Sequence, residues 1–424
     1  MGKKKEVEVI DITGSVPEEI KTVSQPTISS NSLIEEVKSL NVQEEIQTES
    51  LTTMPSNSMT EEELKSSIEL NLAINSFLSS EITISKEDEK RMIIPTGIDL
   101  LDGSLGGGIS TGLVQIIGPP GSGKSAMATR IIVSGRRIWK NKFYAVYIDS
   151  EESMSIDRLI QLGVNPPITP INDIKMETVF KNIQLLCAFK DKYPQYMEVP
   201  WVVVWDSIAN THPEAAETAE DMNSIMGLKA RAFSFYLPKW VPKLNKYNLS
   251  LVAINQTRDK IEMNKFKTRP DMRFMGEKTI PGGESLKFNS IQIIDLRAYS
   301  DIKYETSETP DCYGFPGLKV RTKAVKNKLF CPNIDAEIIF SFERGYSNFW
   351  TNYDLLKEYG RIKTPAGWGS LLELPEIKFR PKLVMETYRS NSQFKEIFDK
   401  NVKEVIQTEI IDKYKSTKEN QIEA

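Results

Sequence analysis

The sequence is poor in the residues that build metal centres and disulfide frameworks. Its 424 residues include three cysteines, Cys187, Cys312 and Cys331, and one histidine, His212. The cysteines form no CxxC pair, so they offer no ligand set for a structural zinc site and indicate reduced thiols. Acid–base chemistry by histidine would depend on His212 alone, and its Thr-His-Pro context is typical of a turn.

Long apolar runs are also missing. No stretch approaches the roughly 18 uninterrupted apolar residues of a membrane helix, so no membrane span is predicted. The N-terminal segment MGKKKEVEVIDI lacks the apolar core of a secretion signal. We therefore expect a cytoplasmic protein, in the host cytoplasm if a phage encodes it.

Aromatic residues are absent from the first 60 positions, which are rich in Ser, Thr, Glu, Gln and Asn. Such a segment cannot bury enough apolar surface to offset its loss of conformational entropy, which predicts a disordered tail at 1–59. Thr60 and Glu63 then have the spacing of a capping box, which predicts a helix start. This helix and the strand-like SEITIS form a predicted N-terminal arm at 60–90.

From about residue 93 the sequence alternates apolar strand candidates with helical segments, which is typical of a mostly parallel, doubly wound α/β sheet. Runs such as Val202–Val204 indicate strands that are covered on both faces. In LKVRTKAVKNK, apolar and polar residues alternate, which predicts an exposed or antiparallel strand. The predicted domains are the disordered tail at 1–59, the helix and strand arm at 60–90, the α/β core at 91–345, and a small C-terminal helical module with a tail at 346–424.

One segment matches a phosphate-binding loop, the P-loop or Walker A motif. GPPGSGKS fits the pattern GxxxxGK[ST], follows an apolar strand and precedes a helical run. Its glycines let consecutive backbone N–H groups point at phosphate oxygens. Lys124 is expected to reach the β- and γ-phosphates and Ser125 to bind Mg²⁺, so ATP and Mg²⁺ are the predicted cofactors. The predicted nucleotide-binding residues are Gly118, Pro119, Pro120, Gly121, Ser122, Gly123, Lys124, Ser125 and Ala126.

Carboxylates follow two other strand candidates. VVVWDS places Asp206 at a strand end, where P-loop proteins hold Mg²⁺ through water. YIDSEES places Asp149, Glu151 and Glu152 just past another strand, where a carboxylate would orient the attacking water. A solvated acidic loop is the alternative for this second group.

Residues 258–283 are locally basic in a chain whose formal net charge is −4. Seven basic and four acidic side chains give the segment a net charge of +3, and Phe266 and Phe274 interleave with the charges. This pattern predicts a loop that follows a nucleic acid backbone, with a solvated surface loop as the alternative. The candidate contacts are Arg258, Lys265, Lys267, Arg269, Arg273 and Phe274.

Taken together, these segments resemble the RecA/RadA recombinases, in particular bacterial and phage-type RecA. The resemblance runs through PTGIDLLDGSLGGG, YIDSEESMSIDRL, WDSIAN, MGLKAR, INQTRDKI, GGESLKF and KAVKNKLFCPNIDAEIIFSFERG. It covers roughly residues 90–370, and the order of its motifs is more specific than a P-loop alone. It implies a RecA-like P-loop ATPase core in which ATP lies between subunits.

The resemblance also implies roles for particular residues. It puts the catalytic glutamate at Glu151 and a glutamine that senses the γ-phosphate at Gln256. It assigns Lys326 and Lys328 to the ATP of the neighbouring subunit. Where an aromatic residue commonly stacks on adenine, this chain has Arg158, whose planar guanidinium could also stack on the base.

Two DNA-binding loops are implied as well. One lies before MGLKAR (226–231), which resembles the helix start after that loop, and the other ends at GGESLKF. The first loop is acidic, and only its end resembles a DNA contact. A structural ion pair is an equal alternative for Arg231. The candidate contacts from these two motifs are Met226, Gly227, Arg231, Ser234, Gly282 and Gly283.

The leading hypothesis is a DNA-dependent ATPase recombinase that forms filaments on single-stranded DNA and promotes homologous pairing and strand exchange, in recombination and DNA repair. The expected partners are single-stranded and double-stranded DNA, further copies of the chain in a helical filament or a ring, and single-strand-binding or mediator proteins. The alternatives are a RecA-core helicase or motor ring, and a non-catalytic paralogue that acts as a loader.

Overall fold

The computed structural model describes most of the chain from residue 91 onward. The predicted tail at 1–59 and arm at 60–90 lie outside this part, and the domain boundaries remain predictions. The described ranges are 91–218, 222–259, 278–279, 283–302 and 313–414.

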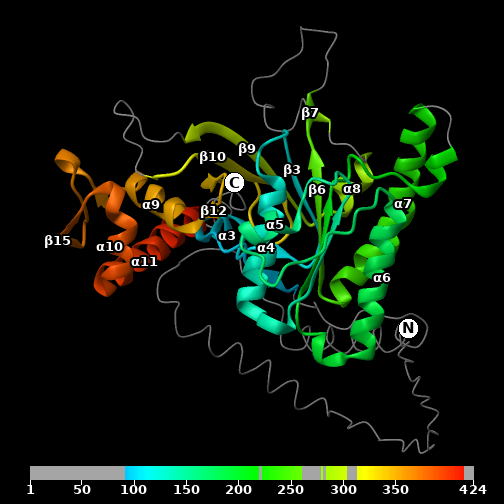
Figure 1. Cartoon of the computed structure of the whole chain (residues 1–424), viewed down its shortest axis with the longest axis horizontal. Coiled ribbons are helices and arrows are strands. Elements are labelled where there is room, and N and C mark those ends of the chain that lie inside the picture. Colours follow the sequence, from blue (N-terminus) through cyan, green and yellow to red (C-terminus); the bar gives the residue numbers. More distant parts are fainter. Residues whose placement is uncertain (1–90, 219–221, 260–277, 280–282, 303–312, 415–424) are drawn as a thin grey trace, which may run out of the picture. The chain divides into compact units, whose positions relative to one another are not determined.

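A sheet of eight strands organises the described core, in the order β12-β11-β10-β9-β3-β6-β5-β4 (Figure 1). β9, β3, β6, β5 and β4 are parallel, whereas the pairs β9–β10, β10–β11 and β11–β12 are antiparallel. The sheet is therefore mostly parallel, as predicted, and LKVRTKAVKNK forms the antiparallel β10. The bounds are β3 Gly112–Gly118, β4 Ala145–Asp149, β5 Trp201–Asp206, β6 Leu249–Gln256, β9 Gln292–Ile302, β10 Gly317–Asn327, β11 Asp335–Ser341 and β12 Gly345–Ser347.

Helices cover both faces of the parallel strands, which makes the sheet doubly wound. Successive side chains of a strand point to opposite faces, so Val203 and Val204 of β5 belong to different buried clusters. Val204 packs in the cluster of α4, and Val203 packs in that of α6 and α7. Figure 1 shows α4 on one side of β3 and β6, with α6 and α7 on the other. The helix bounds are α3 Asp99–Leu105, α4 Lys124–Trp139, α5 Ile156–Gln161, α6 Met176–Lys192, α7 Met222–Lys246 and α8 Gly283–Asn289.

The start of α7 differs from the sequence prediction. MGLKAR indicated a helix start near residue 226, but the helix begins at Met222. It also continues through Pro238 and Pro242. Part of the predicted first DNA-binding loop is therefore helical.

Smaller elements complete the core. β1 pairs with β2 in an antiparallel ribbon, and β7 pairs with β8. The second pair matters for the site, since β7 follows β6 after one residue. The bounds are β1 Ile93–Ile94, β2 Ile109–Ser110, β7 Arg258–Asp259 and β8 Lys278–Thr279.

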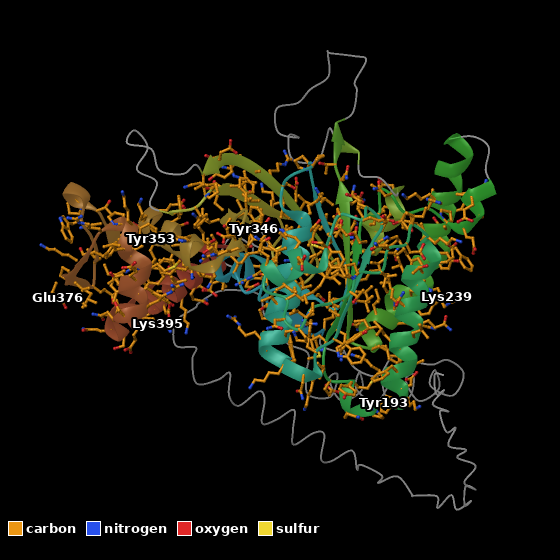
Figure 2. The ribbon with its side chains drawn as sticks, viewed as in Figure 1. Tyr193, Lys239, Tyr346, Tyr353, Glu376 and Lys395 are labelled. Carbon is orange, nitrogen blue, oxygen red and sulfur yellow. The ribbon has the colours of Figure 1, made fainter. Side chains whose placement is uncertain are left out.

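The C-terminal module combines the predicted helices with a three-stranded antiparallel sheet, β13-β14-β15, that the sequence analysis did not anticipate. Tyr353, labelled in Figure 2, is buried here with Phe394 and Phe398. The same cluster includes Leu100 of α3 and Ile339 of β11, so the module packs on the core. The bounds are α9 Asn348–Glu358, β13 Ile362–Lys363, β14 Gly369–Leu371, β15 Leu374–Phe379, α10 Val384–Ser390 and α11 Ser392–Val405, followed by a π-helix at Ile406–Asp412.

Candidate functional site

The P-loop connects the end of β3 to the start of α4, as its motif predicts. Gly123 has φ 87°, and a Cβ atom there would lie 2.4 Å from the Tyr346 hydroxyl oxygen, so only glycine fits. That hydroxyl donates to the Gly123 carbonyl at 3.2 Å. Figure 2 shows Tyr346 near α4, where this contact joins the last strand of the sheet to the loop.

A cavity of about 400 Å³ opens above the P-loop. It lies where β3, β5 and β6 end, which is where parallel α/β sheets bind ligands. Phe342 lines it with about half of its surface exposed. The lining includes Pro120, Gly121, Gly123, Lys124, Ser125, Ala126, Glu151, Arg158, Asp206, Gln256 and Phe342.

Lys124 lies almost buried at the base of this cavity. Its ammonium donates to the Pro119 carbonyl at 2.7 Å, which holds the side chain over its own loop. Burial lowers the pKa of Lys124, and the negative charges of Asp206, Glu151 and Asp295 oppose this effect. A phosphate group in the cavity would give the buried ammonium a stronger partner than a carbonyl oxygen.

Asp206 and Ser125 form the candidate magnesium site. Burial raises the pKa of Asp206, and hydrogen bonds from Ser125 and Tyr147 oppose the rise. One carboxylate, one hydroxyl and the oxygens of a phosphate suit Mg²⁺, which prefers oxygen ligands and keeps several waters. The described residues contain no cluster of three or more His, Cys, Asp or Glu that could hold a metal by itself. The residues present therefore fit a magnesium ion that is shared with a nucleotide.

The structure distinguishes the three carboxylates at the end of β4 and in the turn after it. Asp149 is fully buried, and its carboxylate accepts from the backbone N–H groups of Glu151 at 3.1 Å and Met154 at 2.7 Å. Asp149 thus shapes the turn. Of the other two, Glu151 lines the cavity and Glu152 does not.

Glu151 accepts two hydrogen bonds at the same oxygen, Oε1. The Ser207 hydroxyl donates at 2.5 Å, and the Gln256 amide donates at 3.3 Å. Three strand ends meet here, because Glu151 follows β4, Ser207 follows β5 and Gln256 ends β6. The other oxygen, Oε2, accepts no hydrogen bond from the described residues, so it could accept one from a water molecule beside a bound phosphate.

Gln256 also stands at the root of the predicted second DNA-binding loop. One residue separates it from β7, where Arg258 pairs with Thr279 of β8. These two strands form the stem of the loop. The predicted contacts Lys265, Lys267, Arg269, Arg273, Phe274 and Gly282 lie outside the described residues, as does the side chain of Arg258, while Gly283 begins α8.

The predicted contacts of the first loop lie on one helix. Gly227, Arg231 and Ser234 are exposed on α7 with spacings of four and three residues, which places them on one face. Ser234 donates to the Ala230 carbonyl at 3.0 Å. Met226 lies in the same helix, outside the part whose side chains are described.

Lys326 and Lys328 are not brought to the cavity. Lys326 pairs with Ile293 near the beginning of β9, level with Gln115 in the middle of β3. Its ammonium donates to the carbonyls of Lys287 at 2.7 Å and Phe288 at 3.1 Å. Burial and the charges of Lys328 and Lys287 lower the pKa of Lys326. About three residues of β3, or about 10 Å, separate this level of the sheet from the P-loop.

Arg158 lies at the rim of the cavity. Its guanidinium donates to Gln161 at 2.7 Å and to the Glu343 carbonyl at 3.4 Å. Phe342, the residue before Glu343, also lines the cavity, so an arginine and an aromatic ring are both available there. The sequence analysis considered only position 158 for the base.

Sequence analysis missed four residues of this site, namely Tyr147, Ser207, Phe342 and Tyr346. Each of them reaches the site because the fold brings distant segments of the chain together. No local sequence motif indicates such contacts. Of the four, Tyr147 was the easiest to predict from the sequence. It precedes Asp149 by two residues, so the two side chains lie on the same face of one strand.

A P-loop between a parallel strand and a helix, with carboxylates after neighbouring strands, defines the P-loop class of α/β proteins. No helix in the described residues is long and apolar enough to cross a membrane. A family model described as the RecA N-terminal domain matches residues 70–347. The chain therefore belongs to the RecA family.

Curated relatives agree with the family model. Protein RecA of Mycoplasmopsis pulmonis is 29% identical over 312 residues, which cover 73% of this chain and 84% of the relative. Protein RecA of Chlorobaculum tepidum is 30% identical over 311 residues, covering 71% and 82%. Protein RecA of Syntrophus aciditrophicus is 29% identical over 289 residues, covering 66% and 74%.

Proposed function

We propose that this protein is an ATP-dependent DNA recombinase of the cytoplasm, which forms filaments on single-stranded DNA and promotes homologous pairing and strand exchange. The observation that carries the proposal is the contact between Glu151 and Gln256. It joins the candidate water-orienting carboxylate to the root of the β7–β8 stem. A phosphate that moves Gln256 would thereby change both the hydrolytic site and the loop that holds the basic residues.

The lining of the cavity supports the chemical roles that we propose. Lys124 and the P-loop amides bind the phosphates, while Ser125 and Asp206 hold Mg²⁺, which neutralises phosphate charge when bound. Glu151 orients water toward the γ-phosphate with its free oxygen. Arg158 and Phe342 offer a planar cation and an aromatic face to the base.

Lys326 and Lys328 act on the ATP of a neighbouring subunit in this proposal. Their position supports it, because Lys326 lies level with the middle of β3 and β10 is two strands away from β3, so neither lysine can reach the P-loop of its own subunit. The hydrolytic site is then incomplete in a monomer, so assembly and nucleotide binding are linked. Single-stranded DNA that aligns subunits would stimulate turnover.

The proposal is tested by ATP turnover and electron microscopy of the full chain, with and without single-stranded DNA and a non-hydrolysable ATP analogue. We expect DNA-stimulated turnover, and filaments that require nucleotide. Closed rings that unwind duplexes, with no filaments, would instead support a helicase. Binding of ATP and DNA without stimulated turnover would support a loader.

Replacing Lys326 with alanine is expected to lower DNA-stimulated turnover by about 100-fold, because the site loses one charge that stabilises the transition state. ATP binding by the monomer should stay within about twofold of the parent, since the lysine lies far from its own P-loop. Steady-state turnover and nucleotide titration measure the two effects.

Lys323→Ala is the matched control for this variant. Lys323 lies on the same strand and forms an ion pair with Asp335 at 3.3 Å. We propose no role for it in turnover, so the variant removes a different lysine from β10. Normal DNA-stimulated turnover in Lys326→Ala would show that the assignment to the neighbouring site is wrong.

A further inference from the structure

Tyr147 places a buried hydroxyl beside the candidate magnesium site. The residue lies on β4, is fully buried, and its side chain packs on the α4 face of the sheet with Val204. Its hydroxyl donates to Asp206 Oδ2 at 2.7 Å. Ser125 also hydrogen-bonds to Tyr147 and to Asp206. Both candidate metal-holding residues therefore contact one hydroxyl that comes from a different strand.

The register of the sheet explains why these groups meet. β4 and β5 are parallel, and Tyr147 is aligned with Val204, two residues before Asp206. Side chains two residues apart on a strand share a face, so Tyr147 and Asp206 both point toward α4. The tyrosine ring spans the remaining distance from the body of β4 to the end of β5.

We propose that Tyr147 is a positioning residue for magnesium: its hydroxyl donates to Oδ2 and so fixes the orientation of the Asp206 carboxylate that would hold the ion. Partners of this kind around metal ligands fix the ligand orientation, and their loss commonly lowers metal affinity 10- to 100-fold. The inference rests on the proposed Mg²⁺ and ATP site, and it adds a residue that does not itself touch the metal.

The Tyr147 hydroxyl matters because the Asp206 carboxylate could not readily replace it with another hydrogen-bond donor. Asp206 is almost completely buried, so water cannot easily replace the lost donor. Without the tyrosine hydroxyl, Ser125 would be the one side-chain hydrogen-bond donor left to this carboxylate among the described residues, although Ser125 is also needed at the metal. Tyr147 therefore allows Ser125 to turn toward the metal while Asp206 keeps a hydrogen bond.

The test is Tyr147→Phe in the full chain, which removes one oxygen atom and keeps the ring. Binding of a fluorescent ATPγS derivative is followed while Mg²⁺ is titrated, and separately in EDTA. We expect the half-saturating Mg²⁺ concentration to rise about 10-fold. Nucleotide affinity in EDTA should remain within about twofold, because the P-loop contacts are unchanged.

Tyr388→Phe is the matched control, since Tyr388 donates to Asp399 at 2.8 Å in the C-terminal module. It removes the same kind of hydrogen bond outside the site and should leave the Mg²⁺ titration unchanged. A second measurement uses Asp206→Ala as the background. There, adding Tyr147→Phe should not shift the Mg²⁺ titration further, because the tyrosine acts through Asp206.

Three outcomes would overturn the inference. They are an unchanged Mg²⁺ titration in folded Tyr147→Phe, an equal loss of nucleotide affinity with and without Mg²⁺, and an additive effect in the Asp206→Ala background. Loss of the native circular dichroism spectrum in Tyr147→Phe would also count against it, by making the hydroxyl a requirement for folding. If the parent protein itself showed no Mg²⁺-dependent nucleotide binding, the proposed function would be wrong instead.

Discussion

Replacing Lys124 with alanine is expected to abolish nucleotide-dependent filaments and to lower ATP turnover by about 10²- to 10³-fold. The ammonium of Lys124 lies at the base of the cavity, near the carboxylates of Asp206 and Glu151, where an alanine leaves no positive charge for the phosphates. Alanine keeps the helical propensity of the first turn of α4, so the fold should survive. Electron microscopy with single-stranded DNA and steady-state turnover measure the two losses.

Arg137→Ala is the control for this experiment. Arg137 is an exposed cation in the last turn of α4, at the opposite end of the same helix. Its removal should leave filaments and turnover near the parent values. If Lys124→Ala formed normal filaments with the ATP analogue, the P-loop would not be the site that controls assembly.

Replacing Glu151 with glutamine is expected to separate ATP binding from ATP hydrolysis. The amide oxygen can still accept from Ser207 and Gln256, so the local contacts persist while the carboxylate charge is lost. A positioned general base typically contributes 10²- to 10⁴-fold, so turnover should fall by about 10²-fold or more. Filaments should form normally and persist longer, because hydrolysis no longer resets them. Turnover assays and the lifetime of filaments after dilution measure both effects.

The adjacent variant Glu152→Gln makes the same chemical change one residue away. Glu152 does not line the cavity, so its turnover should stay within about twofold of the parent. Equal losses in the two variants would point to the acidic turn as a whole and away from Glu151 as the water-orienting residue.

The P-loop was predictable from local sequence because its function depends on local geometry. Gly123 and Lys124 lie within one short turn, and the motif carries both the backbone conformation and the charge. The parallel core was predictable for a related reason, since β5 is buried on both faces and reads as a continuous apolar run. The positions of the parallel strands in the sequence could therefore be predicted from the composition and length of the apolar runs.

The acidic turn after β4 shows where prediction from the sequence ended. Asp149, Glu151 and Glu152 are chemically similar and close in sequence, so the residues alone left their roles open. The fold distinguishes them, because Asp149 accepts hydrogen bonds within the turn and Glu151 meets Ser207 and Gln256 from other strands. Only the alignment of three strand ends brings these groups together.

The sequence by itself determined the class of the core, the phosphate-binding loop and the strand ends that carry Asp206 and Gln256, because these features depend on periodicity and short motifs. The tertiary structure alone decided that the Tyr147 hydroxyl donates to Asp206, that Phe342 lines the cavity, and that Lys326 lies away from the cavity, level with the middle of β3. The physical reason is sheet register. The register between strands decides which side chains meet. These strands are far apart in the chain, and no local sequence pattern encodes how they pair.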